Sequence, residues 1–456
     1  METQANNTNS RDLVYQLEGR PPLAIAFPLG MQHVLAMFAS NLAPILIIAG
    51  ACGVAGADLV MMMQCAMLVS GLTTFVQLYP IKIGKNRRIG ANLPIVMGTS
   101  FNFVPTAISV GATAGIGGVI GASLVGSLVE VFMGFFYKHI KRFFPPLVVG
   151  STLTVIGIKL MSAGVGYFGG GSGSPDFGSI QNVSVAFMVL GIVVLLQRFG
   201  RGLWKTAALL VALVVGYIVA FFLGMVDTTS IVEAAWFSLP MPFQFKLTFE
   251  PAAILSFAAL YVTSGLETIG NTSGIAIAGF DREATEEETS GGILADALGS
   301  TVAAVFNSLP NTAFGQNAGI VSMTKVVNKF CIATGAAMLV ISSCIPKLGA
   351  VFAAIPASVM GGAIITVFSI ILLNGMKMIA KAGFSERNLL VLGVTFALGL
   401  GIGGSSEVTA NLPLAVRFVF SDSVTSTCIV AIILNVLFPI TDEEEAERAR
   451  KALLDA

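Results

Sequence analysis

Long apolar runs recur along almost the whole chain, separated by short breaks that carry charges, Pro or Gly. A membrane-spanning helix needs about 20 consecutive apolar residues, and residues 23–49 and 57–79 are the first two runs of that length. Counting runs against breaks predicts about 14 membrane segments. They begin near Leu23, Ala57, Leu93, Thr113, Pro146, Asn182, Trp204, Ala252, Gly291, Ala318, Cys331, Phe352, Asn388 and Val424. The pattern predicts an all-α integral membrane protein.

Two of the predicted segments are interrupted. The third and the tenth are rich in Gly, Pro, Ser, Thr and Asn within residues 91–106 and 307–319. Non-helical backbone at membrane depth is tolerated only where it is buried in protein or lines a cavity. We therefore expect both breaks to serve a site rather than to face lipid.

A short motif that occurs twice in the sequence indicates that the chain contains a duplication. The motif Pro-x-x-Val-x-Gly opens the fifth predicted segment at Pro145 and the twelfth at Pro356. An offset of seven segments makes the second copy enter the membrane from the opposite side, which is an inverted repeat. The interrupted third and tenth segments have the same offset, and this places a substrate site between them near the midplane.

Lys and Arg residues test the predicted orientation, because cytoplasmic loops collect them. With the N-terminus inside, residues 82–88, 138–142 and 198–205 are basic and cytoplasmic, whereas Lys246 and Lys347 lie in outer loops. The pattern predicts a multi-pass protein of the plasma (inner) membrane. Its N-terminal tail (residues 1–22) and its C-terminal tail (residues 441–456) are both predicted to be cytoplasmic.

Composition excludes several classes of protein. The chain is 55% hydrophobic and 11% charged, with a mean hydropathy of +0.85. Its formal net charge is zero and no basic face is concentrated, so nucleic acid is not an expected partner. The five cysteines stand singly in apolar surroundings, without the spacing of metal sites or redox motifs, and we interpret them as packing residues.

Ionisable side chains inside membrane segments are costly and mark functional candidates. His33 lies in the first segment, Glu267 in the eighth and Asp296 in the ninth, whereas Glu130 is placed at the membrane interface, close to Lys138. A structural role is the alternative for each: a satisfied core histidine at His33, a link between helices at Asp296, and a carboxyl capped by hydroxyls at Glu267. For Glu267 the functional interpretation is favoured, because a carboxyl can bind a ligand and exchange a proton.

The two interrupted stretches carry groups that suit a flat heterocycle. Gln316 offers a donor and an acceptor side by side, which can pair with the N–H and C=O edge of a nucleobase. Gly315 lets backbone approach a ring. Asn102 adds another amide, and Phe103 adds an aromatic face for stacking. These residues predict a neutral or weakly acidic planar solute.

The same stretches resemble the nucleobase/ascorbate transporter family, the nucleobase:cation symporters, over nearly the whole chain. The most specific element is residues 316–319, Gln-Asn-Ala-Gly, which is similar to the family signature Gln-(Asn/Glu)-x-Gly. The resemblance implies two inverted repeats of seven segments, with short antiparallel strands in segments three and ten. It also implies a core domain (residues 23–142 and 251–350), a gate domain (residues 143–250 and 351–440) and a homodimer.

The resemblance further implies roles for individual residues. Glu267 and Gln316 would hydrogen-bond the base, with backbone from Phe103 and Gly315 completing the site. Asn102 and Asn317 belong to the same substrate-binding set. Glu267, Asp296, His33 and Asn271 form the proton-coupling set. The combination is most similar to bacterial xanthine permeases, followed by uric acid permeases.

Two positions depart from the family pattern. Asn271 stands where related purine permeases often carry Asp and uracil permeases His, and this departure bears on the proton path. Ala318 replaces an Asn that is common in xanthine permeases, and this position could tune which purine is accepted. No cofactor is expected, and a proton is favoured over sodium as the coupling ion.

Other functions remain open at this point. A uracil or pyrimidine symporter is the nearest alternative, although uracil permeases tend to carry Glu at position 316. An anion carrier of the same inverted fold should present helix N-termini without a facing carboxylate, and Glu267 argues against it. A channel needs a continuous polar lining, whereas the polar groups here cluster at two breaks. An enzyme is disfavoured, because no nucleophile with a base, metal-ligand spacing or phosphate loop is found.

Overall fold

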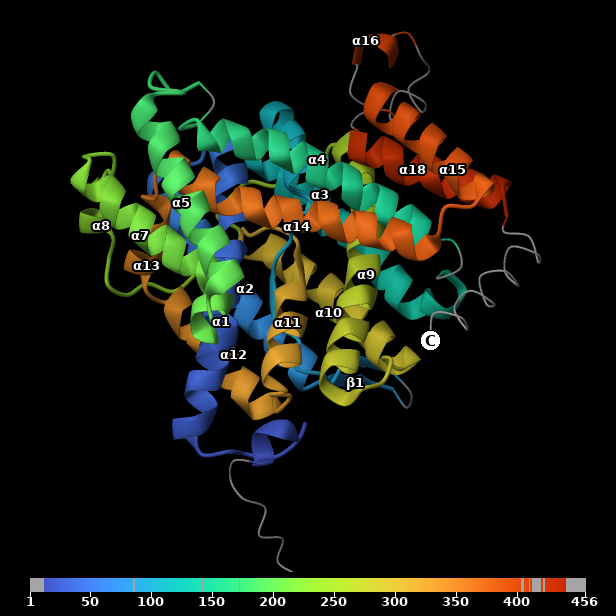
Figure 1. Ribbon diagram of the computed structural model, residues 1–456, viewed down its shortest axis with the longest axis horizontal. Coiled ribbons are helices and arrows are strands. Elements are labelled where there is room, and N and C mark those ends of the chain that lie inside the picture. Colours follow the sequence, from blue (N-terminus) through green and yellow to red (C-terminus); the bar gives the residue numbers. More distant parts are fainter. Residues whose placement is uncertain are drawn as a thin grey trace, which may run out of the picture. The chain divides into compact units, whose positions relative to one another are not determined.

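The computed structural model is mostly helical (Figure 1), and two short strands that lie far apart in the sequence pair with each other. Strand β3 (Met97–Thr99) runs antiparallel to β4 (Asn311–Ala313), with Gly98 opposite Thr312. Both strands are buried and lie in the two interrupted segments. The prediction of antiparallel strands there is confirmed. The structure describes residues 12–84, 87–140, 143, 145–171, 173–402, 406–409, 411, 420 and 423–439.

The chain forms two compact units. The first comprises Met1–Tyr137 and Met161–Val367, and the second comprises Lys138–Leu160 and Phe368–Ala456. The three boundaries fall near the end of helix α3 (Val104–Ile140) and inside helices α4 (Pro146–Phe168) and α14 (Ala357–Ala382). The core and gate boundaries given above stay a prediction, and the C-terminal tail 441–456 and residues 1–11 lie outside the described residues.

The first unit holds most of the helices. In chain order they are η1 (Asp12–Tyr15), α1 (Leu23–Ala51), α2 (Gly56–Leu78), α3 (Val104–Ile140), the end of α4, α5 (Ile180–Phe199), α6 (Leu203–Thr206), α7 (Ala208–Phe222), α8 (Thr229–Glu233), α9 (Pro251–Phe280), α10 (Glu286–Val305), α11 (Gly315–Thr324), α12 (Lys329–Ser343), α13 (Pro346–Ala353) and the start of α14. A hairpin of β1 (Ile81–Ile83) and β2 (Arg87–Ile89) follows α2, and the sequence analysis missed it.

The second unit contains the first part of α4 and the second part of α14. It also holds α15 (Glu386–Phe396), the π-helical stretch η3 (Ala397–Ile402), α16 (Ser406–Thr409) and α18 (Ser423–Leu437). Here α4 and α14 run antiparallel at close range. A Cβ atom at Gly150 would lie 2.8 Å from the Gly375 carbonyl oxygen, and one at Gly157 would lie 2.6 Å from the Leu372 Cα. Gly150 is the glycine of the first Pro-x-x-Val-x-Gly motif, so this motif lies at a helix crossing.

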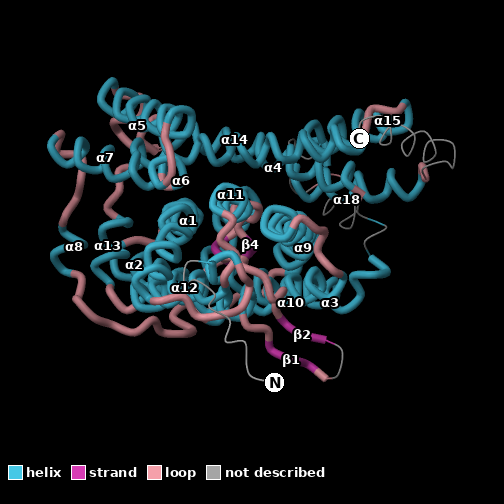
Figure 2. Tube along the Cα trace, turned by 60° about the horizontal axis from the view of Figure 1, so that its bottom comes forward, coloured by secondary structure: helices cyan, strands magenta, loops and turns pink. Residues whose placement is uncertain are grey.

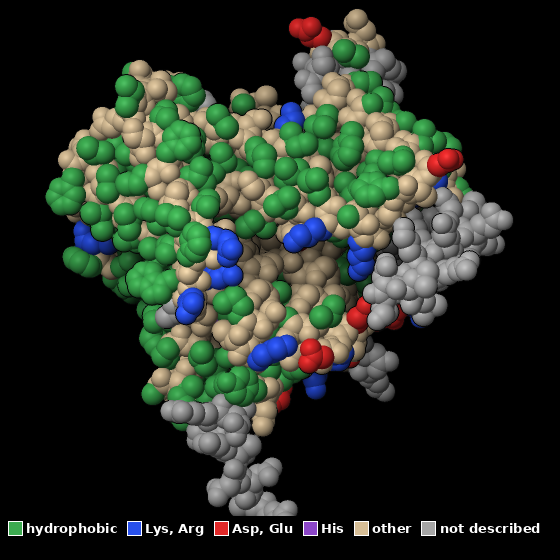
Figure 3. Space-filling view, in the orientation of Figure 1, with side chains coloured by type: hydrophobic (Ala, Val, Ile, Leu, Met, Phe, Trp, Pro, Cys, Tyr) green, Lys and Arg blue, Asp and Glu red, His purple; other side chains and the backbone are tan. Residues whose placement is uncertain are grey.

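Length and composition identify the membrane helices. Within the described part of the chain, seven helices are long and apolar enough to cross a bilayer, or eight if the bent pair α12 and α13 counts as one span. Gly115, at φ 64°, interrupts α3 close to the predicted boundary between the third and fourth segments. On the face drawn in Figure 3, hydrophobic side chains predominate and charged ones are few. The chain is a multi-pass membrane protein; the count of 14 crossings stays a prediction.

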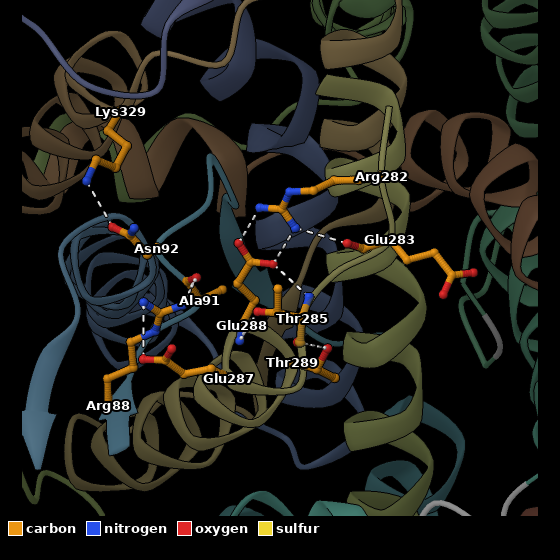
Figure 4. Close-up of polar contacts among 10 residues, drawn as sticks. All are labelled: Arg88, Ala91, Asn92, Arg282, Glu283, Thr285, Glu287, Glu288, Thr289 and Lys329. Atoms are coloured by element: carbon orange, nitrogen blue, oxygen red, sulfur yellow. Dashed lines mark hydrogen bonds and ion pairs between the residues drawn. The ribbon is translucent and has the colours of Figure 1, made fainter. Parts of the chain in front are cut away.

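The acidic run before the ninth predicted segment, residues 283–288, leads into the start of helix α10. Thr285 and Glu288 form a capping box, in which each side chain binds the other residue's backbone N–H at the start of α10. Arg282 donates two hydrogen bonds to the Glu288 carboxylate, at 2.6 and 2.7 Å (Figure 4). Arg88, in β2, lies 3.4 Å from Glu287. The charged run thus fixes the end of a helix.

Candidate functional site

One face of α9 is bound to both interrupted segments. Glu267 accepts a hydrogen bond from the Asn102 amide at 2.5 Å, just before α3 begins. Four residues later, Asn271 donates to the Ala313 carbonyl oxygen at 2.7 Å, at the end of β4. Residues four apart lie on the same helix face. A single stripe of α9 therefore holds the two ends of the β3–β4 pair in register.

Helix α11 begins directly after β4 and lies between α1 and α9 (Figure 2). Its first residue, Gly315, is exposed and lies against Asn271, because a Cβ atom there would approach the Asn271 Oδ1 to 2.9 Å. Only glycine fits this approach without displacing the amide. Further along, Gly274 of α9 faces Ala318 of α11, so the two helices run side by side and parallel.

The predicted substrate-binding residues, together with Asn271 of the proton-coupling set, fall into accessible and buried sets. Glu267, Asn271 and Gln316 are partly exposed, and Gly315 is exposed. No hydrogen bond joins the Gln316 amide to any other residue that the structure describes. The α11 N-terminus also presents backbone N–H groups, which carry partial positive charge. The accessible set thus offers a carboxylate acceptor, two amides and helix N–H donors.

Asn102 and Phe103 belong to the buried set. The Asn102 side chain is 2% exposed and is held by Glu267. The Phe103 ring is fully buried, with ring centroids 5.5 Å from Phe257 and 4.7 Å from Tyr261. The ring therefore packs against protein rings. The expectation that Phe103 serves a base through its backbone, or by stacking, stays a prediction.

Asp296 ties several elements together from the interior. Its carboxylate accepts hydrogen bonds from Thr268 of α9, from Thr312 of β4 at 3.2 Å and from Gln77 of α2 at 3.5 Å. The side chain is 0% exposed. Its neighbour Thr268 follows Glu267 directly, so Asp296 positions the strand and the helix that carry the site. A role in proton coupling stays a prediction for this residue.

His33 and Asn317 are brought together by α1 and α11. The His33 Nδ1 and the Asn317 Oδ1 are hydrogen-bonded, and the Asn317 amide donates to the Pro94 carbonyl oxygen. Both side chains are 3% exposed. This chain of contacts anchors the first turn of α11 to the segment before β3. The structure thus places His33 behind the accessible set rather than within it.

Other polar residues support the site and were missed by the sequence analysis. Asn41 of α1 accepts hydrogen bonds from the Thr99 backbone N–H at 2.7 Å and from Ser70 at 2.9 Å. Gln77 donates to the Gly292 carbonyl oxygen at 3.1 Å, besides its contact with Asp296. An amide inside an apolar run was the available signal, because a buried amide must find partners.

Glu130 was expected at the membrane interface; the structure places it inside the protein, and its depth in the membrane stays a prediction. Its side chain is 0% exposed, and neither carboxylate oxygen has a hydrogen-bond partner among the described residues. Helix α3 turns this acid toward the interior of the protein, and proximity to Lys138 in the sequence does not reveal that burial. In the described part of the chain, no group of three His, Cys, Asp or Glu side chains is placed to hold a metal ion.

The chain matches a known protein family over most of its length. The model of the Xan_ur_permease family, described as a permease family, matches residues 24–407. The chain belongs to the nucleobase/ascorbate transporter family. It is 36% identical to a Clostridium perfringens protein described as a purine permease, over 96% of this chain and 95% of that one. It is 31% identical to the xanthine permease of Bacillus subtilis, over 93% and 97% of the two chains.

Solved structures confirm the inverted-repeat fold of this family member. The transmembrane domain of a cyanobacterial bicarbonate transporter, BicA, matches with a TM-score of 0.59 at 14% identity, covering 92% of this chain and 99% of that one. Murine Slc26a9, an anion transporter in the inward-facing state, matches with a TM-score of 0.65 at 11% identity, covering 94% and 70%. At such low identity the likeness extends to the fold alone.

Proposed function

We propose that this permease takes up a purine nucleobase, xanthine or uric acid, together with a proton. The observation that carries the proposal is the partly exposed Glu267 carboxylate, which Asn102 holds on the face of α9 that also contacts the start of α11, where the partly exposed Gln316 lies. The names of the relatives support the substrate class, since they include purine, xanthine and uric acid permeases.

The chemistry of the accessible set fits the edge of an oxopurine. Such a base presents ring N–H donors and carbonyl acceptors in one plane. Glu267 accepts from N–H groups, while the Gln316 amide donates to a carbonyl oxygen and accepts from an adjacent N–H. A hydrogen bond to a charged partner contributes about 1.5–3 kcal/mol. Asn271 and the backbone at Gly315 complete a polar frame around a flat ligand.

Proton coupling follows from the carboxylates. Among the described residues, the carboxyls of Glu267 and Asp296 have no cation as a hydrogen-bond or ion-pair partner. An ionised carboxylate is costly inside a membrane, and binding a proton is the simplest way to neutralise it. Acidic residues in transporters serve as proton relays. Alternating access is supported by the inverted repeat, because transporters with such repeats bind substrate between half-helices. A homodimer stays a prediction from the family resemblance.

Competition in whole cells tests the proposal. We expect cells that express the chain to take up radiolabelled xanthine, with inhibition by unlabelled uric acid or xanthine and loss of uptake when a proton uncoupler is added. Competition by uracil alone would assign the site to pyrimidines. If no base enters cells in which the chain reaches the membrane, while bicarbonate or sulfate does, the anion carrier replaces this proposal.

A further inference from the structure

Glu130 differs from the other buried acid of this region. Asp296 accepts hydrogen bonds from Thr268, Thr312 and Gln77, and so contributes to holding the fold. Glu130 is equally buried, yet both of its carboxylate oxygens lack a hydrogen-bond partner within the described residues. Unsatisfied buried polar groups are rare in native structures and call for an explanation. A carboxyl in this arrangement adds little to the stability of the fold.

The surroundings of Glu130 lead along α9 toward Glu267. Gly265 lies beside it, since a Cβ atom there would be 3.6 Å from the Glu130 Oε1. The neighbouring Ser264 has a hydroxyl that is likewise buried without a hydrogen-bond partner in the described structure. Ser264 is three residues before Glu267, so both side chains lie on one face of α9. This hydroxyl can donate and accept a hydrogen bond, and it lies one turn of α9 before Glu267 and next to Gly265, which contacts Glu130.

Few groups are available to neutralise Glu130. The ionisable groups that face it in the described structure are Asp296 of α10 with Glu267 and Tyr261 of α9, and none of them is a cation. Tyr261 is already bound to Ser123 at 2.8 Å. Burying an ionised carboxylate without a partner costs several kcal/mol, so such a group binds a proton instead.

We propose that Glu130 is a second proton-carrying group of transport, which exchanges one proton with Glu267 through the Ser264 hydroxyl. The inference rests on the proposed proton-coupled function and adds a residue to it. In the transfer, the Glu130 O–H bond breaks and the proton binds the Ser264 oxygen, while the Ser264 proton passes to a Glu267 carboxylate oxygen. The pair of acids holds one proton and one negative charge before and after. Glu267 is thereby ionised for one step of the cycle and neutral for another.

Glu130→Gln tests this role, because glutamine keeps the size of the side chain but cannot release a proton. In proteoliposomes with purified protein, we expect net xanthine uptake driven by a proton gradient to fall by about 100-fold, in line with the loss of a proton-transfer group. Exchange of external for internal xanthine needs no net proton movement and should stay within about twofold, since binding at Glu267 is unaffected. Glu130→Asp, which keeps the proton, should restore part of the net uptake.

Ser264→Ala supplies a second test that does not depend on the folding of the first variant. We expect it to slow net uptake more than exchange. The matched control is Glu250→Gln, at the exposed start of α9, which should change neither rate. Equal net uptake by wild type and Glu130→Gln would overturn the inference, as would an equal loss of net uptake and exchange in Ser264→Ala. If the wild type neither takes up nor exchanges xanthine, the proposed function itself fails, which is a distinct result.

Discussion

At the scale of single residues, the contact between Gly315 and Asn271 determines how the site is shaped. The Asn271 amide donates to the Ala313 carbonyl oxygen at 2.7 Å, and its oxygen faces the Gly315 Cα closely enough to exclude a methyl group. The first turn of α11 is therefore set against α9 with little freedom. This contact fixes the turn that carries Gln316 against α9, the helix that carries Glu267.

Gly315→Ala should weaken xanthine binding. The added Cβ would lie 2.9 Å from the Asn271 Oδ1, so the amide must move and its hydrogen bond to Ala313 weakens. Loss of one such bond is about 1 kcal/mol, or about fivefold in affinity. Gly319→Ala is the matched control, because nothing lies within 4 Å of a Cβ atom there. Equilibrium binding to purified protein measures both variants, and equal affinities would contradict the account.

The sequence alone identified the residues whose type is unusual inside a membrane. It did not predict their hydrogen-bond partners or their burial. Glu267 and Gln316 stood out because an acid and a polar string interrupt apolar segments. The tie between Asn271 and Ala313 could not be foreseen, since it depends on how α9 packs against β4. The burial of Glu130 could not be foreseen for the same reason, because it follows from the packing of α3 and not from distance along the chain to Lys138.

At the scale of elements, α10 is fixed at its N-terminus by charges outside the predicted membrane segment. Burial alone would raise the pKa of the Glu288 carboxyl, but hydrogen bonds from Arg282 and from Thr285 outweigh it and hold the pKa below 4.5. A carboxyl whose pKa is lower in the folded state stabilises the fold above its ordinary pKa and loses that contribution as the pH falls through the folded value.

Arg282→Gln should therefore destabilise the protein in a pH-dependent way. At pH 7 we expect a loss of about 1 kcal/mol or less, because Arg282 is partly exposed and solvent screens the pair. The difference between variant and wild type should shrink below pH 4.5, as Glu288 takes up a proton. Thermal melting of both proteins in detergent, from pH 7 to below pH 4.5, measures this difference in stability. A difference that grows on acidification would show that the ion pair is not its source.

The interrupted segments were the elements that the sequence predicted best. The register in which their two strands pair was the feature that it predicted least. Gly, Pro and Asn at membrane depth required irregular backbone, and the inverted offset placed the two breaks together. The register of Gly98 opposite Thr312 was not available, because pairing of two three-residue strands leaves little pattern in the sequence. The β1–β2 hairpin was missed because residues 81–89 resemble a basic loop.

At the scale of the whole molecule, the inverted repeat brings corresponding helices into close contact. In the second unit, α4 and α14 approach through Gly150 and Gly375, where a side chain would meet backbone atoms. Such small residues let membrane helices pack closely, and van der Waals contact then stabilises the pair. The repeat motif seen in the sequence thus reports a packing requirement as well as an evolutionary duplication.

Gly375→Val should destabilise this crossing. A Cβ atom there would lie 2.5 Å from the Thr154 backbone nitrogen and 2.8 Å from the Gly150 carbonyl oxygen. Overpacking of this kind costs about 1–3 kcal/mol. Gly393→Val, on α15 of the same unit, has nothing within 4 Å of the new Cβ and serves as the control. A lower melting temperature for Gly375→Val alone is expected; equal melting temperatures would contradict the close crossing.

The most direct test of the central claim is xanthine accumulation by purified protein in proteoliposomes under an inward proton gradient. The account predicts that wild type concentrates radiolabelled xanthine until an uncoupler removes the gradient. Glu267→Gln should reduce uptake by about 10- to 100-fold, because it replaces a charged acceptor of hydrogen bonds by a neutral amide. Xanthine accumulation that does not depend on the proton gradient, or that is unchanged in Glu267→Gln, would contradict proton-coupled purine transport centred on this residue.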